Sequence, residues 1–138
     1  MAETIPAAAA PAPRVVDLAR EPILRTVPQP ADANPNGDIF GGWVLSQMDV
    51  AGGVPAARTA QGRTATVAIN AMEFVQPIKV GDLVSVYGEV VKIGNTSITI
   101  RLETVVQRQL DPTPIRVTEG NYVFVAIDDQ GRPRRVPR

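Results

Sequence analysis

One carboxylate in the first half of the chain, Asp49, stands where it could act in chemistry. It follows a segment in which apolar residues such as Val44 and Met48 recur at helical spacing, which predicts a helix with one buried face. Asp49 would lie at the edge of that face, where ionisation is costly unless a partner is near. Such a carboxylate can act as a general base on water or, alternatively, as a nucleophile.

Two glycines, Gly41 and Gly42, stand where the same helix would begin. A turn-forming run from Asn34 to Asp38 precedes them and contains Asn-Pro and Asn-Gly pairs. Glycine leaves the first backbone N–H groups of a helix uncovered, so a ligand oxygen can approach them. The sequence thus predicts a carboxylate and open helix amides on a single element.

Each of these features also has a structural explanation. Asp49 could pair with Arg58 or Arg63, and close packing would account for Gly41 and Gly42 as well as a ligand does. A second glycine pair, Gly52-Gly53, indicates close approach of a sheet across the helix.

The composition excludes several kinds of chemistry. The chain has no cysteine and no histidine, so it has no disulfide, no thiolate nucleophile, no Ser-His-Asp machinery and no imidazole metal site. With only two tyrosines, and with Lys79 and Lys92 as the only lysines, acid–base work falls to Asp or Glu. We expect no metal and no redox cofactor.

The charge and hydropathy of the chain limit the partners and the cellular location that we expect for it. Its 14 basic and 14 acidic residues cancel, which argues against nucleic-acid binding as its main task. No apolar run approaches the ~18 residues of a membrane span, so we expect a soluble protein without membrane insertion. The absence of cysteine suits the cytoplasm, which is the localisation that we predict.

The chain divides into an arm and one domain. Residues 1–20 are rich in Ala and Pro, and we expect a disordered arm that lacks the basic start and long apolar run of a signal peptide. Residues 21–138 suffice for a single domain with its own core.

The elements of that domain follow from periodicity and turn residues. The helix should run from about residue 42 to 60 and weaken or bend near Gly52, because Pro55 lies inside it. A loop is expected over residues 110–115, which contain Pro112 and Pro114. The expected strands cover residues 23–27, 65–75, 83–93, 97–109 and 117–127. One helix with a mainly antiparallel sheet gives an α+β fold, in which the concave face of the sheet covers the helix.

Five segments in this order resemble the hot-dog fold acyl-CoA thioesterases, and in particular their YciA-like branch, which is related to the brain and cytosolic acyl-CoA hydrolases. They are Asn-Gly-Asp-Ile-Phe-Gly-Gly-Trp and Ser-Gln-Met-Asp, residues 74–82, residues 92–97, and Phe-Val-Ala-Ile-Asp with the following Gly131-Arg132. The resemblance implies an antiparallel sheet wrapped around one central helix, and hydrolysis of acyl-CoA to a fatty acid and CoA without a cofactor. It also implies a homodimer with shared active sites, assembled as a trimer of dimers.

The resemblance assigns roles to particular residues. Asp49 falls on the catalytic carboxylate, and Asn34 on an asparagine that the partner subunit places at the same site. An amide at the start of the helix, from Gly42 or from Gly41, would polarise the thioester carbonyl. The residues implied to contact CoA are Gly94, Asn95, Thr96 and Ser97 in a turn, where many relatives carry Arg in place of Asn95, and Arg132 in the tail.

Two other functions are compatible with the same scaffold. A non-catalytic acyl-CoA-binding or sensing domain would be expected to lack the carboxylate, but Asp49 is present. Dehydratases and hydratases of this fold use a catalytic histidine, which this chain lacks. We therefore predict a thioesterase, with Asp49 slightly favoured as a general base over a nucleophile.

Overall fold

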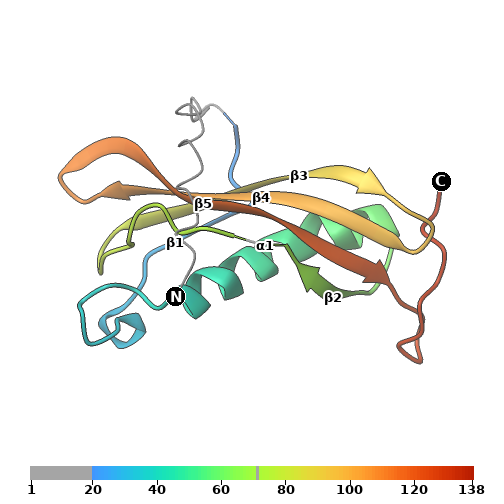
Figure 1. Ribbon diagram of the computed structural model, residues 1–138. Helices are drawn as coiled ribbons and strands as arrows, with labels where there is room; N and C mark the ends of the chain where they lie inside the picture. The colour runs from blue at the N-terminus through green and yellow to red at the C-terminus, as the bar shows by residue number, and fades with distance from the viewer. Residues whose placement is uncertain (1–19, 71) are drawn as a thin grey trace, which may run out of the picture.

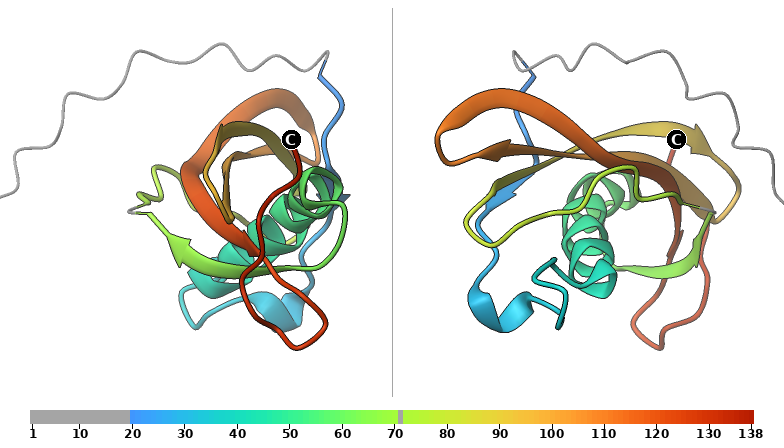
Figure 2. Two further views of the ribbon diagram at one scale, coloured as in Figure 1. Left: turned by 90° about the vertical axis from the view of Figure 1, so that its right-hand side faces the viewer. Right: turned by 60° about the vertical axis from the view of Figure 1, so that its left-hand side comes forward.

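The computed structural model describes residues 20–70 and 72–138. It consists of an antiparallel sheet that curls around one long helix (Figures 1 and 2). This confirms the predicted α+β architecture. The predicted arm, residues 1–20, lies outside the described residues except for Arg20.

Helices and strands do not alternate along the chain, because the one long helix is followed by strands alone. The strand order is β1-β3-β4-β5-β2, and every neighbouring pair is antiparallel. In chain order the elements are β1 (Leu24–Thr26), the 3-10 helix η1 (Pro30–Asp32), α1 (Gly41–Ala60), β2 (Thr64–Ile69), β3 (Leu83–Ile93), β4 (Ser97–Arg108) and β5 (Asp111–Ala126).

The helix α1 lies against the concave face of the sheet, where its apolar stripe is removed from water. Val44 and Met48 are buried as the spacing predicted, whereas Leu45 is only partly buried. The helix and the sheet approach closely at Gly52, where an added Cβ would lie 2.9 Å from Leu102 Cδ1 on β4. The predicted close packing is therefore confirmed for Gly52, but an added Cβ at Gly53 would meet nothing within 4 Å.

Pro55 does not shorten the helix. The helix does not end near Gly52, because α1 is continuous through Pro55 to Ala60, which is the predicted end; the predicted bend near Gly52 stays a prediction. Packing of the buried residues on both sides of Pro55, Gly52 and Ala56, supplies a reason, since tertiary burial dominates helix stability in proteins.

The strand predicted over residues 65–75 is shorter than expected, because β2 ends at Ile69. Beyond it the described residues make separate hydrogen bonds with β5, from Asn70 N to Asn121 O (2.9 Å), from Val75 N to Val117 O (2.9 Å) and from the Thr118 hydroxyl to Glu73 O (2.7 Å). Met72 fills the space beside Gly120, where an added Cβ would lie 2.5 Å from its Cγ. After Ile69, packing of side chains such as Met72 against β5 takes the place of regular backbone hydrogen bonding between strands.

The loop predicted over residues 110–115 is also wrong, because β5 already begins at Asp111. Pro112 and Pro114 are two residues apart, so their backbone nitrogens, which carry no hydrogen, lie on the same side of the strand. β2 pairs with β5 only from Tyr122 to Ala126, which leaves the first half of β5 with a free edge that tolerates proline.

Candidate active site

The predicted carboxylate, Asp49, is half-buried on α1 beside the edge strand β2. Its Oδ1 accepts a hydrogen bond of 2.5 Å from the hydroxyl of Thr66. The structural explanation by an ion pair fails, because Arg63 instead donates to the carbonyl oxygens of Asp128 and Asp129. Within the described part of the chain, no arginine or lysine forms a salt bridge with Asp49. The carboxylate is thus oriented by a neutral donor.

Thr66 is the residue that sequence reasoning missed. It lies within the strand predicted over residues 65–75, but the alternation of side chains along a strand does not say which face meets α1. The contact joins residues of two elements across a turn, so it follows from packing rather than from periodicity.

A buried tyrosine lies close to the same carboxylate. Tyr122 on β5 is fully buried, and its hydroxyl donates a hydrogen bond of 2.9 Å to the carbonyl of Leu45. Burial, and secondarily the negative charge of Asp49, raises the pKa of Tyr122 far above its ordinary value. The phenol therefore remains protonated and serves as a fixed donor rather than as an acid or base.

The N-terminus of α1 is open, as the glycines predicted. No side chain caps it, and its first turn contains no acidic residue. An added Cβ at Gly42 would meet nothing within 4 Å, while one at Gly41 would lie 3.6 Å from the ring of Phe74. Close packing therefore gives no reason for Gly42, and its amide is free to meet a ligand oxygen.

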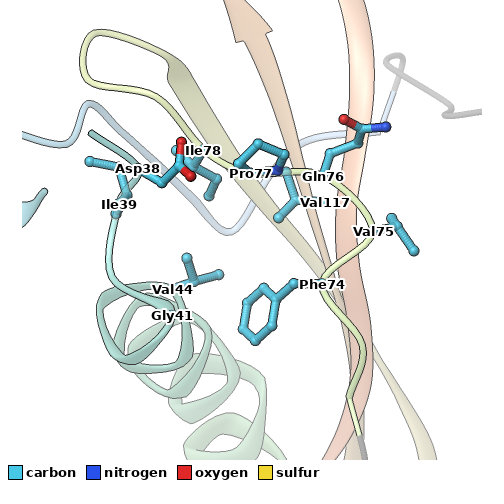
Figure 3. A pocket seen from close by; sticks show the side chains of 10 residues that line it. All are labelled: Asp38, Ile39, Gly41, Val44, Phe74, Val75, Gln76, Pro77, Ile78 and Val117. Carbon is cyan, nitrogen blue, oxygen red and sulfur yellow. The ribbon is translucent and has the colours of Figure 1, made fainter. Parts of the chain in front are cut away.

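A cavity of about 430 Å³ lies beside this helix start (Figure 3). Its wall is mainly apolar, and the Asp38 carboxylate stands at one side of it. The segment after β2 supplies Phe74 and Val75, both exposed in the single chain. The lining residues are Asp38, Ile39, Gly41, Val44, Phe74, Val75, Gln76, Pro77, Ile78 and Val117.

Asn34 lies in the loop that leads to α1, and its side chain is held in a defined orientation. Its Oδ1 accepts hydrogen bonds from the backbone N–H groups of Asn36 (2.9 Å) and Asp38 (3.1 Å). Two backbone donors require the oxygen at that position, so the Nδ2 group points away and is available to donate. Among the described residues, no hydrogen bond joins Asn34 to Asp49 within one chain.

The turn from Gly94 to Ser97 lies at the opposite end of the molecule from Gly42. Gly94 N donates to Ser97 O (2.8 Å), and Val136 N donates to Asn95 O (2.9 Å). Ala126 N donates to Thr96 O (2.9 Å), and Arg134 joins Ala126 O to Ala60 O, so the turn lies near the C-terminal end of α1, a helix of 20 residues that is about 30 Å long. One chain thus does not bring all the predicted site residues together.

The arginines of the tail differ in role. Arg134 donates to Ala60 O at the end of α1 (2.8 Å) and to Ile127 O (3.1 Å), so it is a structural cap. Arg138 donates to Gly94 O (2.9 Å) beside the turn. Arg132 is exposed and is held through its backbone, since its N–H donates to Asp128 Oδ1 (2.9 Å) and its carbonyl accepts from Asp128 N (2.8 Å).

Two further findings concern the described residues as a set. In residues 20–70 and 72–138, no three His, Cys, Asp or Glu side chains are grouped so that they could hold a metal ion. The helices of the same ranges include none that is long and apolar enough to cross a membrane.

Comparison with known proteins gives consistent results. Residues 36–111 match the model of the Thioesterase superfamily. The chain is 47% identical over 119 residues to an uncharacterized acyl-CoA thioester hydrolase of Haemophilus influenzae, covering 84% of this chain and 77% of the relative. It is 44% identical to the acyl-CoA thioester hydrolase YciA of Escherichia coli K12, covering 83% of this chain and 89% of that protein.

Solved structures agree with these relatives. The hexameric thioesterase y2039 of Yersinia pestis superposes with a TM-score of 0.81 at 47% identity, over 86% of this chain and 96% of that one. HI0827, a hexameric broad specificity acyl-coenzyme A thioesterase, superposes with a TM-score of 0.80 at 45% identity, over 85% of this chain and 81% of that one.

Proposed function

Since the chain belongs to the thioesterase superfamily, we infer that its reaction is the hydrolysis of acyl-CoA to a free fatty acid and CoA. The chain is an acyl-CoA thioesterase with the hot-dog fold. The observation that carries this conclusion is 44–47% identity to acyl-CoA thioester hydrolases over more than four fifths of the chain. The substrate is the CoA thioester itself, and the proposed chemistry uses no further cofactor.

Asp49 is the proposed catalytic carboxylate. As a general base it would take a proton from water while the water oxygen attacks the thioester carbon, after which the C–S bond breaks and the CoA thiolate takes up a proton. As a nucleophile it would itself attack the carbon and form a mixed anhydride that water then cleaves. The hydrogen bond from Thr66 orients the carboxylate in either route.

The amide of Gly42, or that of Gly41, is the proposed donor to the thioester carbonyl. Negative charge develops on that oxygen in the transition state, and an uncapped helix N-terminus offers both N–H groups and the positive end of the helix dipole. The apolar cavity beside it would receive the acyl chain.

Asn34 is the proposed polar partner from the second subunit. Its free Nδ2 group can donate a hydrogen bond to the oxygen of an attacking water or to the carbonyl oxygen of the thioester. The absence of an Asn34–Asp49 bond within one described chain supports a site completed across an interface.

We place that interface at the free edge of β2. Thr64–Ile69 is an edge strand with apolar side chains exposed in the single chain, among them Val67 (58%) and Ile69 (45%), and Val50 on α1 is likewise exposed (59%). An unpaired apolar edge favours pairing with a second copy. The hexameric state of the similar structures supports a trimer of such dimers.

The CoA portion is proposed to lie along Gly94, Asn95, Thr96 and Ser97, with Arg132 meeting its phosphates. The separation of this turn from Gly42 in one chain supports a substrate that runs from one subunit to the next. Cytoplasmic localisation remains a prediction from the composition.

Steady-state hydrolysis of short, medium and long acyl-CoA tests this proposal, with wild type compared with Asp49→Asn. The substitution keeps the size and removes the charge, so we expect a loss of about 10²-fold or more in kcat. Asp129→Asn, in an exposed turn, is the matched control and should retain activity. If neither wild type nor variant hydrolyses any substrate while both bind CoA, the sensing function is correct instead.

A single turnover in ¹⁸O-labelled water tests the general-base role of Asp49. Label recovered in the Asp49 carboxyl group would rule out simple base catalysis, because it requires water to attack the Asp49 carbon of a mixed anhydride.

A further inference from the structure

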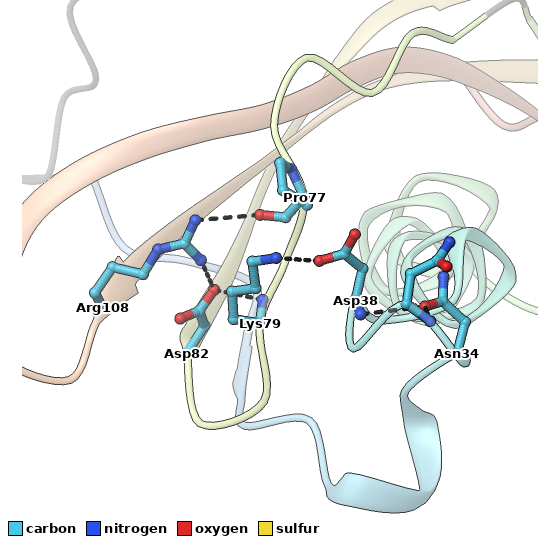
Figure 4. Close-up of polar contacts among 7 residues, drawn as sticks. Asn34, Asp38, Pro77, Lys79, Asp82 and Arg108 are labelled. Atoms are coloured by element: carbon cyan, nitrogen blue, oxygen red, sulfur yellow. Dashed lines mark hydrogen bonds and ion pairs between the residues drawn. The ribbon is translucent and has the colours of Figure 1, made fainter.

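A continuous set of polar contacts joins the end of β4 to the loop that contains Asn34 (Figure 4). We call it the Asn34 relay, and its members are Arg108, Asp82, Lys79, Asp38 and Asn34. None of these contacts except those of Asn34 itself is needed by the mechanism proposed above. The relay therefore calls for a separate explanation.

The first part of the relay is centred on the buried Asp82 and anchors the turn after residue 77. Arg108 forms an ion pair with Asp82, whose side chain is only 3% exposed, and also donates to Pro77 O (3.3 Å). The other contact of Asp82 is with Lys79, whose backbone N–H donates to Asp82 Oδ2 (2.8 Å). Arg108 ends β4, so the turn is fixed to the rigid sheet.

The second part crosses from this turn to the loop before α1. The Lys79 ammonium pairs with the Asp38 carboxylate, and the two residues also form an antiparallel backbone bridge. Next to them, Ile39 N donates to Ile78 O (2.9 Å). The loop is thus held at one point by both backbone and side chain.

The third part fixes the amide of Asn34. Asp38 N donates to Asn34 Oδ1 (3.1 Å), and Asn34 N donates back to Asp38 O (2.7 Å). Any movement of Asp38 therefore moves the Asn34 side chain. Conversely, holding Asp38 against Lys79 sets the direction of the Asn34 Nδ2 group.

We propose that Lys79 and Asp38 are positioning residues for catalysis, which act by holding the Asn34 amide in its donating orientation. This inference rests on the proposed role of Asn34 in the thioesterase site. The Lys79 side chain is 48% exposed and that of Asp38 31%, so the pair contributes little to folding. Its effect is to restrict a loop, where a small displacement of a polar group lowers the rate.

Lys79→Met tests the proposal, because it removes the charge, keeps the stem, and changes no residue of the cavity lining. We expect kcat to fall about three- to fivefold, the range that an exposed ion pair can supply, with KM changed less than about twofold. Lys79→Glu should lower kcat further through repulsion of Asp38, and Lys79→Arg should restore most of it. Glu89→Gln, which breaks the exposed pair with Arg101 on another part of the sheet, is the control and should leave kcat unchanged.

A double-mutant cycle with Asn34→Ala separates positioning from other effects. If Lys79 acts through Asn34, adding Lys79→Met to Asn34→Ala should change kcat by less than about 1.5-fold. Equal further losses in both backgrounds would refute the relay. A rise in KM with unchanged kcat would also refute it, since Lys79 would then contact the substrate directly.

The cycle also distinguishes failure of this inference from failure of the proposed function. If Asn34→Ala lowers kcat and Lys79→Met does not, positioning by Lys79 is wrong and the role of Asn34 stands. If Asn34→Ala itself has no effect, the proposed role of Asn34 is wrong, and the relay is overturned with it.

Discussion

Gly52 and Gly53, which are adjacent in the middle of α1, allow a prediction about stability in which each position serves as the control for the other. Gly52→Ala would place a Cβ 2.9 Å from Leu102 Cδ1 and 3.0 Å from Phe124 Cζ. Such separations require the neighbouring side chains to move. Gly53→Ala, one residue later in the same helix, would place its Cβ in open space.

The magnitudes follow from two opposing effects. Alanine favours a helix over glycine by about 1 kcal/mol at either position. Overpacking a filled core costs about 1–3 kcal/mol, and this applies only to Gly52. We therefore expect Gly53→Ala to stabilise the protein by up to about 1 kcal/mol and Gly52→Ala to be less stable than Gly53→Ala by about 1–3 kcal/mol, because the helix preference cancels in the comparison.

Urea unfolding followed by circular dichroism measures this difference. The protein concentration must be the same for both variants, since association contributes to apparent stability. Adding Leu102→Val to Gly52→Ala creates room on β4 and should reduce the penalty of the added Cβ. If Gly52→Ala and Gly53→Ala unfold within about 0.5 kcal/mol of each other, the close contact of α1 with β4 and β5 is wrong.

Three further predictions concern other contacts. Arg134→Met removes the donors to Ala60 O and Ile127 O, and should lower the free energy of unfolding in urea by about 1 kcal/mol; no change would show that solvent caps α1 equally well. Arg108→Met leaves the buried Asp82 carboxylate without its ion pair and should cost about 3 kcal/mol, measured in the same way, while an additional Asp82→Asn should recover part of the loss. The raised pKa of Tyr122 means that the unfolded chain loses this proton near the ordinary value of 10.0 while the folded chain keeps it. The resulting stability is complete below that pH and is lost as the pH rises above it, so the urea midpoint should fall less between pH 9 and pH 11 in Tyr122→Phe than in wild type.

The long periodic elements could be predicted from sequence. The strand over Leu83–Ile93 has the predicted bounds, and α1 begins one residue earlier than expected, at Gly41. Both elements are bordered by glycine-containing turns and show a sustained repeat, so local and tertiary preferences agree. The open helix start at Gly42 was predicted from residue type, because glycine has no side chain to cover the first backbone N–H groups.

The remaining features depend on neighbours in space. The alternation after Ile69 is typical of a strand, but Met72 packs beside Gly120 and the ladder is lost. The prolines at 112 and 114 indicate a loop, yet the free edge of β5 accommodates them. Likewise, the hydrogen bond between Thr66 and Asp49 depends on where β2 lies relative to α1, which no periodicity specifies.

The order of the strands has a consequence for how the chain folds. β3, β4 and β5 are consecutive in sequence and pair with one another, so they can form as two successive hairpins within microseconds. β2 precedes them, yet Thr64 must pair with Ala126 at the far side of β5, which requires closure of a long loop. We therefore expect β2 to join the sheet late. Until it does, the edge of β5 is exposed, and a β2 strand from another nascent chain could occupy it, so strand exchange between copies is the characteristic misfolding hazard of this topology.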